Sequence, residues 1–398
     1  MAIQNFYYIV TSSRSFFIQM VFTLNAIYYV TQADLNALQL VLIGTIMEVS
    51  VLLFEMPTGL FADHYGRKKS LALGTFVIGF AHILEGSTPE FWAIAGASAL
   101  WGIGWTFISG AEQAWIADEL DGKHLEETFL RGAQFSSFAR FVAILVSVSI
   151  AAIWSVQTAI LVAGVMLIIL AIWAFINLPE TKFVKVTREK GVSGVTHMMT
   201  SIKFGMSQIR GNTILVSIAM VTLLWGLASE GFDRLYGAHF ITDYDLSESE
   251  SVYWFGTFYA IAFLLNIVVL KFVEKHVDGR YANVLLLTNA VLVGTMIVFA
   301  WTGQFWLAVA MYWVTSALRN INYPLVSIIT NERLQSKGRA TALSMFGQLD
   351  AFGQIAGGPL VGLLALYTSV AGGITTSALL ILPVLYLLWR MKGKMKVS

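Results

Sequence analysis

The sequence has no cysteine among its 398 residues, which excludes disulfide bonds, cysteine-ligated zinc and iron–sulfur clusters. Its six histidines are scattered and never form the His-Glu-x-x-His spacing of a zinc site. A Gly-x-x-x-x-Gly-Lys-Ser/Thr phosphate loop is also missing, so the chain is not itself an ATP-driven pump. We therefore expect no metal, no cofactor and no enzymatic activity.

Charged residues are scarce, at 12% of the chain against about 25% in an ordinary soluble domain. Hydrophobic residues make up 57%, and a soluble fold of this length needs more polar surface than the remainder supplies. The net charge of +1 gives no indication of nucleic acid as a partner. Composition therefore predicts an all-α polytopic protein whose surroundings are a lipid bilayer.

Long apolar runs mark the candidate membrane spans, since a helix needs ~20 mostly apolar residues to cross a bilayer. Twelve runs fit, at residues 12–31, 37–62, 70–87, 91–117, 128–152, 156–177, 211–241, 250–272, 281–302, 304–329, 339–366 and 369–390. The first run lacks the design of a cleavable signal, so we expect it to remain as a helix. The sequence predicts twelve transmembrane helices in two six-helix, pseudo-symmetric halves.

The longest polar stretch, residues 178–210, separates the two halves and is rich in basic residues. We assign residues 1–180 to an N-terminal six-helix bundle, 181–210 to a cytoplasmic linker and 211–398 to a C-terminal six-helix bundle. Within the linker, residues 195–209 form either an amphipathic helix on the membrane surface or a plain tether.

Lysine and arginine fall in alternate loops of the twelve-span arrangement, namely after spans two, four, six, eight and ten and in the C-terminal tail. The opposite loops contain Asp and Glu but neither Lys nor Arg. Because basic loops stay inside, we expect both termini and the linker to be cytoplasmic. The chain is then a multi-pass protein of the cell inner (cytoplasmic) membrane.

Ionisable residues inside the spans are the candidates for function, since a charge at the bilayer centre costs at least ~2.5–3.5 kcal/mol and persists only when paired, solvated or used. Arg319 and Asp350 lie at similar depth on adjacent spans, and we expect them to form an ion pair. Glu112 and Arg140 are the analogous pair of the first half. By contrast, Arg14 is expected to snorkel at a helix end, and Glu85 to reach water.

Two interpretations of these pairs stay open: static bridges that lock helices together, or a carboxylate that exchanges its arginine for a proton or a cationic substrate. Burial disfavours the charged form of a carboxyl, so a buried acid can bind and release protons near neutral pH. Glu230 is our first choice for this role and Glu112 the second. Asn320 adds a polar group at the depth of Arg319. Four aromatic residues lie deep enough to line a cavity: Trp105, Trp225, Tyr259 and Trp313.

A polar loop, predicted over residues 59–70, follows the second span and reads Gly-Leu-Phe-Ala-Asp-His-Tyr-Gly-Arg-Lys-Lys-Ser. Its order resembles the signature loop between the second and third helices of the major facilitator superfamily of transporters. The matching residues are Gly59, Asp63, Gly66, Arg67 and Lys68. Twelve spans, two halves and a basic linker extend the resemblance over the whole chain, and Asp278-Gly279-Arg280 repeats the motif weakly after span eight, as duplicated halves predict.

The resemblance implies that the loop controls conformational change. Asp63 would face the N-terminus of span eleven, where a helix favours an anion, and Arg67 would pair with Asp118 or Glu119 at the end of span four. The segments 55–59 and 114–119 resemble bacterial members that are drug-efflux-like. Two features of proton-coupled drug exporters are missing, however: an Arg before the Gly-x-Gly of span four, where Ser98 or Ala99 stands, and a Gly-Pro motif in span five.

We therefore expect a monomeric secondary transporter with alternating access to a cavity between the halves, with protons and a small molecule as its partners. The first hypothesis is a proton-coupled exporter (an antiporter) of amphipathic or cationic compounds. The alternative is an importer or exchanger of a small polar nutrient or metabolite, bound by Arg140, Arg319, Asn320 and Asn322. A third hypothesis, from another class, is a membrane sensor or lipid-handling protein that transports nothing.

Overall fold

The computed structural model describes residues 2–184, 203, 206–207, 209–277, 279–334 and 339–395. The regular secondary structure of these residues is entirely helical and includes no strand, which confirms the predicted all-α fold class. Most of the predicted linker (181–210) lies outside the described residues, as does Asp278 of the weaker second motif.

The helices alternate with short connections. Their bounds are α1 Ile3–Ile27, α2 Ala37–Tyr65, α3 Arg67–Ser87, α4 Phe91–Glu119, α5 Leu125–Ile153, α6 Val156–Asn177, α8 Thr213–Ala238, α9 Glu248–His276, α10 Tyr281–Trp301, α11 Phe305–Arg333, α12 Arg339–Tyr367, α13 Val370–Leu380 and α14 Leu382–Met395. Two π-helical turns, η1 Tyr28–Gln32 and η2 His239–Asp243, extend α1 and α8. In the described part of the chain, ten segments are long and apolar enough to cross a membrane, and α13 with α14 forms one of them.

Two predicted boundaries were wrong. The first helix begins at Ile3 instead of residue 12, because Tyr7 and Val10 are buried and the Thr11 hydroxyl bonds the Tyr7 carbonyl at 2.8 Å. The predicted loop 59–70 is almost entirely helical: α2 continues to Tyr65 and α3 begins at Arg67. Gly66 alone separates the two helices, at φ +110°.

The chain forms two compact units. Unit 1 consists of the described residues of Met1–Gln39, Ile46–Thr187 and Asp245–Ala260, and unit 2 of those of Leu40–Thr45, Arg188–Tyr244 and Ile261–Ser398. Most of unit 1 thus precedes the predicted linker, and most of unit 2 follows it. The domain limits at residues 180 and 210 stay a prediction.

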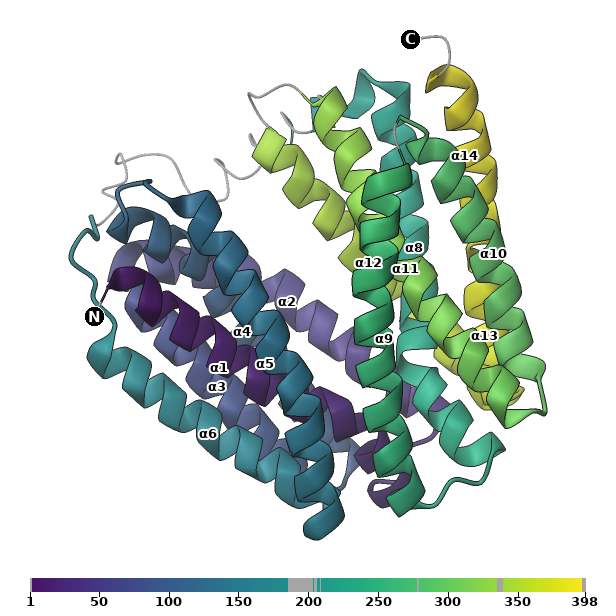
Figure 1. Cartoon of the computed structure of the whole chain (residues 1–398), viewed down its shortest axis with the longest axis horizontal. Helices are drawn as coiled ribbons and strands as arrows, with labels where there is room; N and C mark the ends of the chain where they lie inside the picture. Colours follow the sequence, from purple (N-terminus) through teal and green to yellow (C-terminus); the bar gives the residue numbers. More distant parts are fainter. Residues whose placement is uncertain are drawn as a thin grey trace. The chain divides into compact units, whose positions relative to one another are not determined.

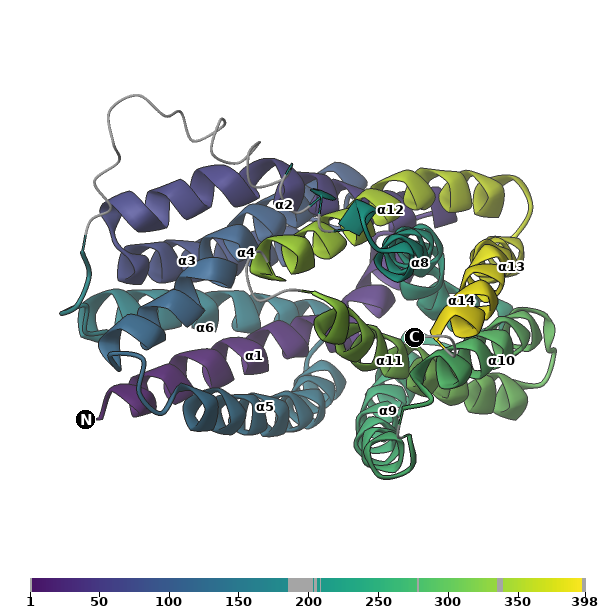
Figure 2. The same ribbon diagram turned by 90° about the horizontal axis from the view of Figure 1, so that it is seen from above.

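Unit 1 is a bundle in which α3 packs on α4 and α6, and α1 packs on α5 and α6 (Figure 1). Small residues bring α3 and α4 together: a Cβ atom at Gly104 would lie 2.9 Å from the Gly74 carbonyl oxygen. In unit 2, α8 packs on α12 and α13, and α10 packs on α11 (Figure 2). The α8–α12 contact is equally close, with Gly226 against the Asp350 carbonyl. Helices held this close position the charged residues described below.

The corner after α1 is repeated after α8. Each helix ends in a π-helical turn, which is followed by an aspartate with positive φ: Asp34 at 49° and Asp245 at 53°. Two residues further on, a capping box begins the next helix, from Asn36 to Gln39 and from Ser247 to Glu250. Residues 28–39 and 239–250 therefore correspond position by position, as a duplicated six-helix half predicts.

Candidate functional site

In unit 1, the charged pair at mid-helix is Arg14–Glu112. Arg14 Nη2 lies 2.5 Å from Glu112 Oε1, and the two side chains are only 6% and 17% exposed. The expectation that Arg14 snorkels at a helix end was wrong, because α1 begins at Ile3 and places Arg14 in its middle turns. The predicted Glu112–Arg140 pair was also wrong, because Glu112 takes Arg14 as its partner.

Arg140 lies on the exposed surface of α5 and has no hydrogen bond or ion pair with any described residue. Its depth follows from the contact between α1 and α5, in which the Tyr7 ring lies against Gly132. Seven or eight residues further along both helices come Arg14 and Arg140, so both guanidinium groups lie at one level of the bundle. At this level of unit 1, Glu112 pairs with Arg14, and Arg140 has no acid partner among the described residues.

Stacked aromatic rings lie on α4, two to three turns before Glu112. Trp101 and Trp105 are parallel to within 7°, with their centroids 5.6 Å apart, and Phe22 packs on Trp101. Trp105 is 38% exposed, and Trp101 Nε1 is buried with no hydrogen-bond partner in the described residues. Trp105 therefore presents a flat apolar face, as predicted for a cavity aromatic, although its role stays a prediction.

Unit 2 contains a larger charge cluster on α8 and α11. Arg319 binds Asp233 with both guanidinium nitrogens, at 2.5 and 2.6 Å. One turn earlier, Glu230 pairs with Arg234 at 3.2 Å. The Glu230 side chain is only 4% exposed, and Gly44, an α2 residue grouped with unit 2, lies so close that a side chain there would displace its carboxylate.

Asp350 of α12 completes this cluster without forming the predicted pair. Its carboxylate accepts a hydrogen bond from Gln354 at 2.8 Å, while Arg319 is held by Asp233. The predicted Asp350–Arg319 pair was therefore wrong. The cluster contains three carboxylates (Glu230, Asp233 and Asp350) and two guanidinium groups (Arg234 and Arg319).

Two predicted binding or cavity residues of unit 2, Trp225 and Asn322, take part in contacts between helices, and their binding role stays a prediction. Trp225 Nε1 donates to Asn289 at 2.9 Å, and Asn289 bonds Asn322 at 3.0 Å, which links α8, α10 and α11. Asn322, a substrate ligand in the polar-nutrient hypothesis, is thus turned towards α10. Asn320 is exposed and donates to the Ser316 carbonyl of its own helix. Trp313 of α11 is half-buried, and so is Tyr259 of α9, which belongs to unit 1.

The residues of the signature motif form a group of polar contacts at one end of unit 1. Arg67 pairs with Asp118 and donates to the Ala114 carbonyl at 2.8 Å, so the contact implied by the family resemblance is present. The Lys68 backbone amide donates to Glu180 at 2.8 Å, which puts a carboxylate at the N-terminus of α3. Asp63 is half-buried and has no hydrogen bond or ion pair with the described residues. The conformational role of the motif stays a prediction.

We expect Gly66→Ala to lower the free energy of unfolding of the protein by about 1–2 kcal/mol. Gly66 has a φ of +110°, a value that L-residues adopt only with strain, and an added Cβ would lie 2.6 Å from Glu180 Oε2. Gly59→Ala is the matched control, since Gly59 lies in exposed helix with no atom within 4 Å of an added Cβ. Alanine there should be neutral or stabilise by about 0.5–1 kcal/mol. Equal melting temperatures of the two variants would contradict this account.

A buried cluster on α3 and η1 was not anticipated. His82 Nδ1 lies 2.9 Å from Glu85, and Tyr29 donates to the same carboxylate at 2.5 Å. Glu85 is 5% exposed, so the expectation that it reaches water was wrong. The η1 turn covers it with two tyrosines, and the Tyr28 hydroxyl bonds the Glu85 carbonyl at 2.8 Å.

Sequence reasoning missed three charged residues of the two clusters: Arg14, Asp233 and Arg234. Arg14 was expected to snorkel near a helix end, and neither Asp233 nor Arg234 was assigned a functional role. A usable signal was the i,i+4 spacing of Glu230 and Arg234, which places both on one face of α8. No comparable signal exists for Arg14–Glu112 or Asp233–Arg319, whose partners lie on helices far apart in sequence.

Comparison with known proteins agrees with this architecture. The family model described as Major Facilitator Superfamily matches residues 7–348. An uncharacterized MFS-type transporter of Bacillus subtilis (strain 168), YxaM, is 22% identical over 372 residues, which cover 90% of this chain and 89% of the relative.

Solved structures show the same fold at low identity. The nucleoside transporter NupG has a TM-score of 0.78 at 13% identity and covers 98% of this chain and 99% of its own. A bacterial homolog of the human lysosomal transporter Spinster has a TM-score of 0.77 at 12% identity, with 99% and 97% covered.

A helical membrane protein with charged clusters inside its spans is the class that these observations define. The chain belongs to the Major Facilitator Superfamily. It is therefore a multi-pass membrane transporter and not an enzyme, as the sequence predicted.

Proposed function

We propose that this protein is a proton-coupled secondary transporter of a small polar organic solute, working by alternating access. The proposal rests on the charge cluster around Glu230. This residue lies on α8, and its side chain is only 4% exposed. Three acids face two arginines in this cluster. Binding of one proton by Glu230 would remove one negative charge from this group, and its loss would restore a charge that a buried carboxyl tolerates poorly.

A polar solute is supported by the charges of unit 1. Arg140 has no acid partner among the described residues, whereas Arg14 is paired with Glu112. An anionic or strongly polar group on the solute would satisfy Arg140. NupG, one of the solved structures with this fold, is a nucleoside transporter, which is consistent with a polar solute.

Export of amphipathic or cationic compounds is the second candidate function. It is favoured by the acid excess of unit 2 and by the exposed face of the Trp101–Trp105 stack, since aromatic faces attract cations. In this case the solute would displace an arginine from Asp233 or Glu230. Both functions use Glu230, but they differ in the sign of the solute charge.

Purified protein in liposomes with an imposed pH gradient tests both candidates. We expect accumulation of a polar or anionic compound from a panel of nucleosides, amino acids, short peptides and carboxylic acids, driven by the gradient. A panel of lipophilic cations tests the second candidate, together with the drug susceptibility of expressing cells. If no compound of either panel moves in response to the gradient, the proposal fails and the non-transporting sensor hypothesis gains support.

Glu230→Gln is expected to abolish gradient-driven accumulation, by about 100-fold or more, because the amide cannot bind and release the proton. Exchange of solute without a gradient should persist in this variant. Glu126→Gln is the matched control, because Glu126 is exposed in the first turn of α5, and it should transport normally. Retention of gradient-driven transport by Glu230→Gln would exclude this carboxylate as the coupling site.

The orientation follows from the basic loops and is proposed with the function. Both termini face the cytoplasm in the cytoplasmic membrane, and a single chain performs transport. Arg67, Asp118 and Asp63 then lie at the cytoplasmic end, where their contacts would regulate conformational change.

Asp63→Asn should reduce turnover while solute binding is retained.

A further inference from the structure

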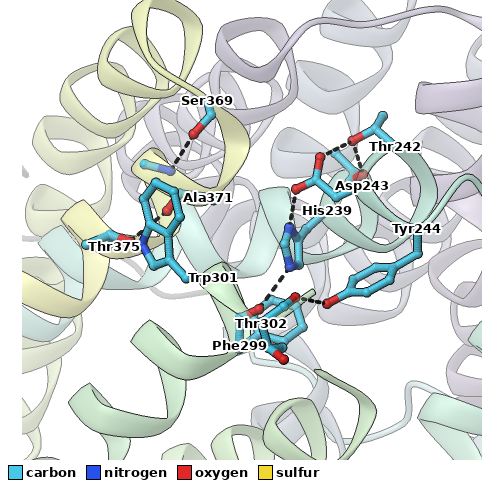
Figure 3. Close-up of polar contacts among 12 residues, drawn as sticks. His239, Thr242, Asp243, Tyr244, Phe299, Trp301, Thr302, Ser369, Ala371 and Thr375 are labelled. Carbon is cyan, nitrogen blue, oxygen red and sulfur yellow. Dashed lines mark hydrogen bonds and ion pairs between the residues drawn. The ribbon is translucent and has the colours of Figure 1, made fainter. Parts of the chain in front are cut away.

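The corner of unit 2 contains a buried histidine whose two ring nitrogens both face acceptors (Figure 3). His239 Nδ1 lies 2.6 Å from Asp243 Oδ2, and Nε2 lies 2.9 Å from the Phe299 carbonyl oxygen. The imidazole is 2% exposed, whereas the Asp243 side chain is 44% exposed. The histidine is thus enclosed, but its carboxylate partner can exchange protons with the surroundings.

These contacts fix the number of protons on the pair. A backbone carbonyl only accepts, so Nε2 must carry a hydrogen, and the short Nδ1–carboxylate contact needs a second hydrogen between its atoms. The pair therefore holds one proton more than neutral imidazole and carboxylate, as an imidazolium beside an aspartate. Phe299 lies in the last turn of α10, where the partial negative charge of a helix C-terminus favours a cation.

The equivalent corner of unit 1 makes the same contact without a titrating histidine. Tyr28 occupies the position of His239, and its hydroxyl donates to the Glu85 carbonyl, two residues before the end of α3. Phe299 is likewise two residues before the end of α10. Gln32 stands where unit 2 has Asp243. The corresponding corners thus differ at two positions. In unit 2 these differences make the contact between η2 and the end of α10 depend on a proton.

We propose that His239 and Asp243 form a proton-binding site, separate from Glu230, that fastens η2 to the end of α10 when protonated and releases it when the proton leaves. Among the described residues, Tyr244 is a further titratable group in contact with the imidazole: its ring lies 5.6 Å away, and its hydroxyl donates to the Thr302 carbonyl. From α10, the described contacts supply carbonyl oxygens and the Phe299 ring. From α11, Tyr312 contacts Phe240.

Release follows from hydrogen-bond accounting. After loss of the proton, the neutral imidazole has one N–H for two acceptors, so either the Phe299 carbonyl or the Asp243 carboxylate loses its donor. Either loss leaves a buried acceptor unsatisfied or removes a hydrogen bond to a charged group. The equilibrium constant between η2 bound to the end of α10 and η2 released from it therefore falls by about 10- to 100-fold. Opening of η2 should therefore increase at higher pH, where the shared proton is lost.

A single engineered cysteine can report this opening, because the natural chain has none. Ile241 lies in η2 and is 7% exposed, so Ile241→Cys should react with a maleimide only when η2 opens. The measurement is the protection factor, the ratio of labelling rates of denatured and native protein at the same pH, which cancels the titration of the thiol itself. We expect this protection factor to decrease by at least about tenfold between pH ~5.5 and pH ~8.5.

Two variants on the Ile241→Cys background distinguish an effect of protonation at His239 and Asp243 from a purely structural role of these side chains. His239→Gln with Asp243→Asn supplies a neutral donor and acceptor at each position, and its protection should be independent of pH. Asp243→Asn alone removes the charge that stabilises the imidazolium, so the midpoint of the pH dependence should move to lower pH. A flat profile in the parent protein, or an unchanged midpoint in Asp243→Asn, would overturn the proposal. Glu230→Gln should leave the profile unchanged, which distinguishes this site from the coupling site.

Discussion

Replacing Arg14 by methionine is expected to destabilise the protein by about 3–5 kcal/mol, the cost of leaving one member of a buried ion pair without its partner. The Glu112 side chain is 17% exposed and its salt-bridge partner in the structure is Arg14, at 2.5 Å. Without the guanidinium, the carboxylate must either remain charged inside the bundle or take up a proton. Thermal unfolding of the purified protein in detergent measures the loss.

The double variant Arg14→Met with Glu112→Leu decides what the pair is for. Replacing both partners of a buried pair by apolar residues of similar size is often neutral or stabilising. If the pair is a static bridge, the double variant should regain stability and transport together. If Glu112 exchanges its arginine for a proton or a solute, the double variant should be stable but unable to transport. A double variant as unstable as Arg14→Met would contradict the assignment of an isolated pair.

An exposed pair of the same unit is the control for this experiment. Arg131 and Glu127 lie 2.8 Å apart on α5, with side chains 61% and 54% exposed. Surface pairs contribute about 0–1 kcal/mol, so Arg131→Met should change the melting temperature very little. A loss as large as that of Arg14→Met would show that the assay responds to charge removal in general and not to burial.

Replacing Arg319 by methionine is expected to lower transport by about 100-fold. Arg319 binds both oxygens of Asp233 and also lies 5.2 Å from the centre of the Phe232 ring. Each charged hydrogen bond contributes about 1.5–3 kcal/mol, and removal of the guanidinium leaves three carboxylates with one arginine. Gradient-driven uptake in liposomes measures transport, and thermal unfolding reports any accompanying loss of stability.

Arg319→Lys is the informative companion, because lysine keeps the charge but cannot bind a carboxylate with a planar fork. If charge balance governs the cluster, the lysine variant should transport nearly normally. If the two-point contact with Asp233 sets the position of α11 against α8, the lysine variant should be impaired almost as strongly as the methionine variant. Full activity of Arg319→Met would remove Asp233–Arg319 from the mechanism altogether.

Much of the fold follows from the sequence, because apolar length is a local property. A run of ~20 apolar residues has few alternatives to a spanning helix, and the predicted span 156–177 coincides with α6. Boundaries were harder where polar residues belong to a helix. The start of α1 at Ile3 and the helical residues after Gly59 depend on packing against neighbouring helices, which residue-by-residue hydropathy does not contain.

The sequence by itself determined which ionisable residues lie within the spans, because the long apolar runs enclose Glu112, Arg140, Glu230, Arg319 and Asp350. Only the tertiary structure decided their partners. Glu112 binds Arg14 and not Arg140, and Arg319 binds Asp233 and not Asp350. The physical reason is that a pair forms where two helix faces meet at one depth. Helical periodicity fixes the face of a residue on its own helix, but not the rotation and register of helices distant in sequence.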